Sequence, residues 1–288
     1  MLKKLLKYDM KAVSGLWWIG AVVSVAAAIV GSFLIRTFIA ISESNVESIF
    51  LDLISTLALI AGIFCVIAIP ISYVFTMILV FVRFFRHFFT DEGYLTFTLP
   101  VKRSTLLLSK TLNASIWLIA HAVLTVISFL LFVLFVYPPE HGELINFTPF
   151  EVVGKLISNL WSSIGAWLIV YAFEVLLIAF VGLMFSIFLV HFCITVGSVL
   201  VKKAKLIVSI AIYYAFTSAL TTATQIVAFL FANFMSDGLS ILMENATEGQ
   251  AYAVIALLVL VIISIFAVIS TLVYSATQYL LDRKLNLA

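Results

Sequence analysis

Six long apolar stretches alternate with short polar segments along the 288 residues of the chain. Each stretch has at least the roughly 20 mostly apolar residues that an α-helix needs to cross the hydrocarbon core of a bilayer. The pattern therefore predicts an all-α membrane protein with six transmembrane helices. The approximate ranges of these spans are 14–39, 52–81, 111–137, 161–191, 206–235 and 251–281.

The first 13 residues have a different pattern, in which apolar and basic side chains fall on opposite faces of a helix. The apolar face holds Leu2, Leu5, Leu6, Met10 and Val13, and the basic face holds Lys3, Lys4, Lys7 and Lys11. We expect residues 1–13 to form an amphipathic helix in the membrane interface, with its lysines at lipid headgroups. Asp9 falls on the apolar side, either as a tolerated acid or because it contacts another part of the protein. Residues 14–288 then form a single six-helix transmembrane domain.

Composition supports a membrane protein rather than a soluble one. Charged residues make up 10% of the chain, whereas soluble domains contain about 25%. The apolar run from about Val13 to Ile35 is too long for a cleaved signal peptide, so we interpret it as a retained span. Cys65 and Cys193 both lie in apolar runs without a CxxC pattern, which is typical of packing residues.

The basic residues predict the orientation, because cytoplasmic loops of membrane proteins are rich in Lys and Arg. With a cytoplasmic N-terminus, all of the 16 Lys and Arg residues except Arg36 and Lys155 fall in cytoplasmic segments. Most acidic residues fall on the opposite side. The distribution predicts that both termini are cytoplasmic, since an odd number of spans would break the alternation.

One polar and aromatic segment between the second and third spans stands apart from the rest. Residues 83–110 contain five of the 16 basic residues and are predicted to be cytoplasmic. Within them, Thr90 is expected to cap a short helix that Leu99 and Pro100 end, because the residue before proline disfavours helix. Pro100 is then expected to open the next helix, with Lys102, Arg103 and Lys110 at the headgroups.

The short helix has apolar and aromatic side chains, which a merely solvated loop would not need. Such side chains, exposed in a cytoplasmic hairpin, favour a docking surface for a partner. The residues that we assign to this surface are Thr90, Asp91, Glu92, Tyr94, Leu95, Phe97 and Leu99.

Glu174 is the one acidic residue well inside a predicted span, near the middle of 161–191. A charged side chain there costs about 2.5–3.5 kcal/mol on insertion scales, so we expect it to face other helices or a cavity. It either contacts substrate or protons, or is hydrogen-bonded to a neighbouring hydroxyl or to His121.

A polar stripe runs along the fifth span at steps of three and four residues. It contains Tyr214, Thr217, Ser218, Thr221, Thr222 and Gln225. These side chains are disfavoured toward lipid, so they line a translocation pathway or join helices. His121 and His191 have no ligand partners at metal-binding spacing, and we predict no metal site.

The chain lacks the sequence motifs of common enzymes. It has no HExxH, no GxSxG and no GxxxxGK[ST], so it is not expected to bind ATP through a P-loop or to catalyse a reaction.

Two stretches resemble a known family. LKKLLKYDMKA at residues 2–12 and DEGYLTFTLPVKRSTLLLSK at residues 91–110 resemble the membrane subunits of type-2 ABC exporters of Gram-positive bacteria. The resemblance implies a dimer with itself or with a sister permease, and two copies of a soluble P-loop ATPase that hold the ATP and Mg²⁺. It also implies that Thr90–Leu99 is the coupling helix, and that a short re-entrant segment precedes the last span. The sequence of residues 236–250 itself fits a short interfacial or re-entrant helix better than a free loop.

We therefore expect an ABC exporter permease in the bacterial cytoplasmic membrane, without a cofactor of its own and without a nucleic-acid partner. Its substrate would be amphipathic or hydrophobic, such as a peptide toxin, a bacteriocin or other antimicrobial peptide, or a drug. Two alternatives stay open: an ion-coupled secondary transporter that uses Glu174, and a non-transporting membrane scaffold or sensor.

Overall fold

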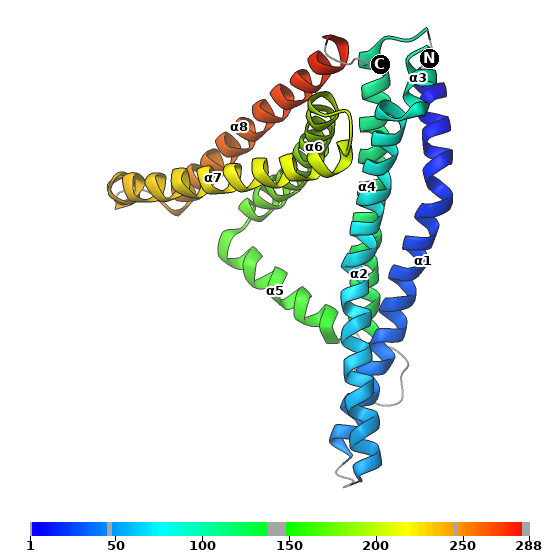
Figure 1. Ribbon diagram of the computed structural model, residues 1–288. Coiled ribbons are helices and arrows are strands. Elements are labelled where there is room, and N and C mark those ends of the chain that lie inside the picture. Colours follow the sequence, from blue (N-terminus) through cyan, green and yellow to red (C-terminus); the bar gives the residue numbers. More distant parts are fainter. Residues whose placement is uncertain (1, 45–47, 99, 137–147, 245–246, 284–288) are drawn as a thin grey trace. The chain divides into compact units, whose positions relative to one another are not determined.

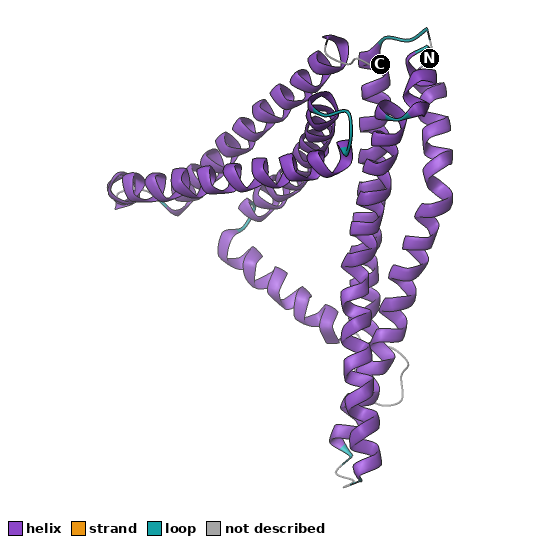
Figure 2. Cartoon of the chain, viewed as in Figure 1, coloured by secondary structure: helices purple, strands orange, loops and turns teal. Residues whose placement is uncertain are grey.

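The computed structural model describes residues 2–44, 48–98, 100–136, 148–244 and 247–283, without the side chains of residues 148, 231–232 and 234–244. Throughout these ranges the regular structure is helical, which confirms the all-α prediction (Figure 2). The helices are α1 (Leu2–Glu43), α2 (Ile49–Phe89), α3 (Asp91–Phe97), α4 (Arg103–Val136), α5 (Thr148–Ile164), α6 (Trp167–Leu200), α7 (Lys205–Glu244) and α8 (Glu248–Arg283) (Figure 1).

Six of these helices are long and apolar enough to cross a membrane, namely α1, α2, α4, α6, α7 and α8. This agrees with the six predicted spans, and the chain is a multi-pass membrane protein. Residues 2–13 continue directly into the first span as one helix, α1. Most spans extend beyond the predicted apolar ranges, because polar residues at their ends continue the same helices.

Two predicted boundaries differ from the structure. The predicted span 161–191 begins too early, since α5 ends at Ile164 and α6 starts only at Trp167. Gly165 separates them with a φ of +55°, a left-handed conformation that glycine adopts without strain, and its N–H donates to the Trp161 carbonyl at 2.8 Å. Residues 236–244 are helical as expected, but they continue α7 instead of forming a separate re-entrant helix.

The described chain forms two compact units, which we treat separately. Unit 1 contains residues up to Arg83 and Leu108–Leu160, and unit 2 contains Phe84–Leu107 and the residues from Trp161 onward. Unit 1 is thus built mainly from α1, α2, α4 and α5. Unit 2 is built from the end of α2, α3, the start of α4, and α6, α7 and α8.

Small residues bring α1 and α2 close together in unit 1. A Cβ atom on Gly31 would lie 2.7 Å from the Cys65 Cβ, and one on Gly62 would lie 2.5 Å from the Ile35 Cγ1. Membrane helices pack closely where side chains are this small, because van der Waals contact replaces the hydrophobic driving force. Cys65 also packs against the core around Ile69, as the sequence predicted.

A buried histidine joins the helices of unit 1 through polar contacts. His121 on α4 hydrogen-bonds with Ser72 through Nε2 at 3.0 Å and with Thr76 through Nδ1 at 2.9 Å. Trp17 on α1 packs edge-on against the imidazole ring. Both ring nitrogens are therefore satisfied inside the unit, which gives His121 a structural role.

In unit 2, α6 packs against both α7 and α8. The approach to α7 is closest at Gly197, where a Cβ atom would lie 2.8 Å from the Ser209 backbone. Phe84, at the end of α2, stacks on the buried His191 of α6 with ring centroids 3.9 Å apart. These contacts hold the end of α2, and with it α3, against the long helices of the unit.

Candidate functional site

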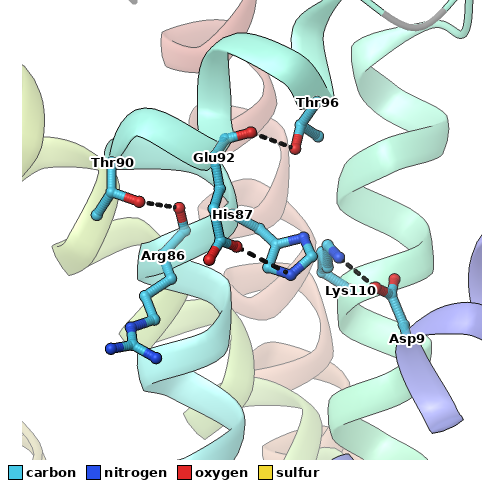
Figure 3. Close-up of polar contacts among 7 residues, drawn as sticks. All are labelled: Asp9, Arg86, His87, Thr90, Glu92, Thr96 and Lys110. Atoms are coloured by element: carbon cyan, nitrogen blue, oxygen red, sulfur yellow. Dashed lines mark hydrogen bonds and ion pairs between the residues drawn. The ribbon is translucent and has the colours of Figure 1, made fainter. Parts of the chain in front are cut away.

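The candidate docking site is α3, a seven-residue helix that follows α2 after a single residue, Thr90. Thr90 occupies the N-cap position as predicted. Contrary to the prediction, its hydroxyl makes no capping hydrogen bond to α3. It donates instead to the Arg86 carbonyl of α2 at 2.6 Å (Figure 3). The Thr90 side chain thus gives a hydrogen-bond partner to a carbonyl in the last turn of α2. Asp91 and Glu92 supply the negative charge that favours the first turn of α3.

The end of α3 and the start of α4 also differ from the prediction. α3 ends at Phe97, and Thr98 closes it by donating its backbone N–H to the Tyr94 carbonyl at 3.2 Å. The predicted last residue, Leu99, lies outside the described residues. Pro100 does not open the next helix, because α4 begins at Arg103.

α3 is fixed to unit 2 through two of its residues. The Phe97 ring packs edge-on against Phe88 of α2 at 5.5 Å, and the Arg103 guanidinium lies 5.2 Å from the centre of the Phe97 ring. Gly93 is buried against the end of α2, where a Cβ atom would meet the Phe88 carbonyl oxygen at 2.7 Å. Phe97, which we had assigned to the docking surface, is therefore an internal anchor.

Two basic side chains extend this anchoring to other helices. Arg103 donates to the Leu281 carbonyl and, at 3.1 Å, to the Asp282 carbonyl, in the last turn of α8. Lys205, at the start of α7, donates to the Phe89 carbonyl at 3.3 Å. Carbonyls at helix ends lack partners within the helix and attract cations, so these bonds satisfy the ends of α2 and α8. Arg103, which the sequence predicts at lipid headgroups, thus also contacts protein.

The opposite side of α3 is open. Tyr94 is 68% exposed and Leu95 is 69% exposed, although both are apolar side chains on an anchored helix. Asp91 is exposed beside them, and Glu92 lies 3.5 Å from the His87 Nε2 (Figure 3). The structure thus brings together four of the seven predicted docking residues on an exposed acidic and apolar surface, which we call the α3 surface (Asp91, Glu92, Tyr94 and Leu95).

Gly93→Ala is expected to displace α3. The new methyl group would overlap the Phe88 backbone, which cannot rotate away, so we expect a destabilisation of about 1–3 kcal/mol despite the better helix propensity of alanine. Hydrogen–deuterium exchange of residues 91–97 should become faster. Gly154→Ala is the control, because a Cβ atom there meets nothing within 4 Å. Equal exchange in both variants would show that α3 is not held by this contact.

A buried ion pair lies at the start of α1 in unit 1. The Lys110 ammonium donates to Asp9 Oδ1 (Figure 3), and the Ser109 hydroxyl donates to Oδ2 at 3.0 Å. Asp9 is only 6% exposed, and Val13 on the same face is buried, whereas the predicted lysine face is exposed. Asp9 is therefore a protein contact, and the prediction that Lys110 lies at lipid headgroups is wrong.

The predicted intramembrane acid, Glu174, is buried on α6. It is 3% exposed and lies about two turns after the start of α6, not near the middle of its helix as predicted. Its Oε1 atom has no hydrogen-bond partner among the residues that the structure describes.

The polar stripe lies on an exposed part of α7. Tyr214, Ser218, Thr221, Thr222 and Gln225 are exposed, and Thr217 is half-buried. The Thr217 hydroxyl donates to the Tyr213 carbonyl at 2.7 Å, and that of Thr222 donates to the Ser218 carbonyl at 2.9 Å. Within the described part of the chain, no hydrogen bond or ring contact joins the stripe to Glu174. The structure therefore does not bring the two sets of pathway candidates together.

Sequence reasoning missed the contacts that fix these groups. The Arg103–Leu281 and Asp9–Lys110 pairs join residues about 180 and 100 positions apart, and no local pattern signals them. A local signal did exist for aromatic residues near Glu174, because Trp167 and Tyr171 precede it by seven and three positions on one helix face.

No family model, curated protein or solved structure matches this chain.

Proposed function

We propose that this chain is the permease subunit of an ATP-driven ABC exporter in the bacterial cytoplasmic membrane. The observation that carries the proposal is the α3 surface, where Tyr94 and Leu95 are exposed on a short helix that is anchored through its other side. An exposed apolar pair on a rigid element is typical of a protein-binding site. The partner in this proposal is a soluble P-loop ATPase, bound in two copies, which supplies the nucleotide site that the chain lacks.

The anchoring of α3 also supports a mechanical role. A force on α3 would pass through Phe97 to Arg103, and from Arg103 to the end of α8. It would also reach the end of α2, whose Phe89 carbonyl binds Lys205 of α7. A small movement of the ATPase would thereby reach several membrane helices at once, as an alternating-access cycle requires. In this scheme a second permease, identical or a sister, completes the complex, and the stripe on α7 lines the pathway or the contact between permeases.

The substrate in this proposal is amphipathic or hydrophobic, such as a peptide toxin, an antimicrobial peptide or a drug. Aromatic and aliphatic side chains dominate the membrane helices, and these suit an apolar molecule better than a sugar. A second candidate function, ion-coupled transport by the chain alone, is favoured by the buried Glu174 carboxyl, whose Oε1 atom has no partner in the described structure. Intramembrane acids of this kind serve as proton sites in secondary transporters.

Co-purification separates these functions. The tagged chain, extracted gently from its native membrane, is expected to bring down a soluble P-loop ATPase in a one-to-one ratio. Reproducible absence of such a protein would contradict the exporter. Proteoliposomes that contain the chain alone provide the matched test, because uptake driven by a proton gradient without ATP would establish the secondary transporter. A chain that shows neither activity would be a scaffold or sensor.

A further inference from the structure

Glu174 is a buried acidic side chain that lacks a partner at one oxygen. Its Oε1 is inaccessible to solvent and unbonded within the described residues, and the whole residue is 3% exposed. A buried carboxyl oxygen without a hydrogen-bond partner is costly, because the interior does not replace the hydrogen bonds of water. The Glu174 Oε1 atom is therefore best explained as the acceptor for a cation from outside the chain.

Aromatic residues share the face of α6 that carries Glu174. Trp167 and Tyr171 precede Glu174 by seven and three positions, which places all three on one side of the helix. The Trp167 ring lies 6.5 Å from that of Tyr171 and 6.3 Å from that of Tyr252 on α8. Side chains of an α-helix tilt toward its N-terminus, so the Glu174 carboxyl extends toward the turn that carries Tyr171.

A hydrogen bond fixes the aromatic group. The Tyr171 hydroxyl donates to the Tyr252 carbonyl at 3.1 Å, which ties α6 to α8 at the level of the rings. All four residues belong to unit 2, and α6 and α8 pack along each other there.

These residues are suited to an organic cation. Aromatic faces attract an ammonium or guanidinium group through the ring quadrupole, and a carboxylate pairs with its charge. A metal ion would require several oxygen or nitrogen ligands, and no group of three such residues gathers in the described part of the chain. We propose that Glu174, with Tyr171, Trp167 and Tyr252, binds the protonated amine of an amphipathic ligand, whose apolar part lies against the rings.

Two molecules offer this chemistry, an amine-bearing substrate and the ethanolamine headgroup of a lipid. Identification of the ligand as a transported substrate rests on the proposed function, whereas the binding itself does not. The test therefore uses the purified chain without an ATPase. If binding fails, the exporter proposal is untouched, and if no ATPase co-purifies, the amine site still stands.

The experiment measures binding of dansyl-pentylamine, a fluorescent amphiphile with a primary amine, to the chain in phosphatidylcholine nanodiscs, with empty nanodiscs subtracted. Its N-acetylated derivative has nearly the same shape but no charge. We expect the amine to bind roughly tenfold to a hundredfold more tightly than the acetylated derivative, as one charged hydrogen bond allows. Glu174→Gln should abolish this preference, and Glu174→Asp should retain part of it. Trp167→Leu and Tyr252→Leu should weaken amine binding by roughly threefold to tenfold.

Matched controls separate the site from general effects of charge and aromatic content. Glu248→Gln removes an exposed acid from the first turn of α8, and Trp161→Leu removes an exposed tryptophan from α5; both should bind as the unmodified chain does. Phosphatidylethanolamine in the nanodiscs identifies the source. If this lipid weakens probe binding to the unmodified chain but not to Glu174→Gln, the natural ligand is a lipid headgroup. If the lipid leaves probe binding to the unmodified chain unchanged, the natural ligand is a free amphiphile. Equal affinity for both probes, or unaltered preference in Glu174→Gln, would overturn the proposal.

Discussion

Replacing Lys110 by alanine is expected to lower the free energy of unfolding by about 3–5 kcal/mol. The Lys110 ammonium is the cationic partner of the Asp9 carboxylate, and both side chains are 8% exposed. Without the ammonium, the carboxylate would stay buried with only the Ser109 hydroxyl to satisfy it. The loss reflects this uncompensated charge more than the strength of the pair itself, because a buried ion pair also pays a large desolvation cost when it forms. Thermal unfolding in detergent micelles measures the effect.

Two further variants make that measurement specific. Lys11→Ala removes an exposed lysine from α1 and is expected to change stability by less than about 0.5 kcal/mol. The double variant Asp9→Asn with Lys110→Gln removes both charges and keeps polar groups at both positions, so it should recover much of the loss. A Lys110→Ala protein as stable as Lys11→Ala would show that the buried pair does not hold α1 against α4.

Replacing Tyr94 and Leu95 by aspartate is expected to abolish binding of the proposed ATPase. Each side chain is exposed in the free chain, so the substitution removes no packing from unit 2. In a bound complex each would be a central apolar contact, and loss of such a contact costs about 2 kcal/mol or more, before the added desolvation of two carboxylates. Two such losses amount to about 4 kcal/mol, or roughly a thousandfold in affinity. Quantification of the co-purified ATPase measures it.

Conservative and distant substitutions provide the controls for this second prediction. Tyr94→Phe keeps the ring and is expected to keep the ATPase, whereas Tyr8→Asp introduces the same charge at an exposed tyrosine of α1 and should have no effect. Membrane levels of all variants should match those of the unmodified chain. Full ATPase recovery with the double aspartate variant would remove the α3 surface from the proposed contact.

The six membrane helices and the short helix between two of them were accessible from sequence because each depends on local information. Apolar length predicts a span, and the sequence from Thr90 to Pro100 contains start and stop residues at helical spacing. Even so, local rules gave the wrong role for the Thr90 hydroxyl and the wrong start for α4. At Thr90 the Arg86 carbonyl of α2 accepts the hydroxyl that local rules assign to the cap of α3.

The inward or outward direction of individual side chains was less predictable. Phe97 and Tyr94 are both aromatic and lie three residues apart, yet one packs on Phe88 and the other is exposed. The sequence predicts that Arg103 and Lys110 lie at lipid headgroups, but each binds a group far away in the sequence. Only the packed structure decides between lipid, water and protein for such residues, because their local sequence suits all three.

The bond between Arg103 and the Leu281 carbonyl also bears on the timing of synthesis. Its two residues are 178 positions apart, and bacterial and eukaryotic ribosomes add about 5–20 residues per second. Arg103 therefore emerges about 10–35 s before the carbonyl to which it donates. During that interval the short helix ahead of it lacks its connection to the end of α8. The attachment of α3 to α8 is therefore completed only after residue 281 has been synthesised, well after α3 itself.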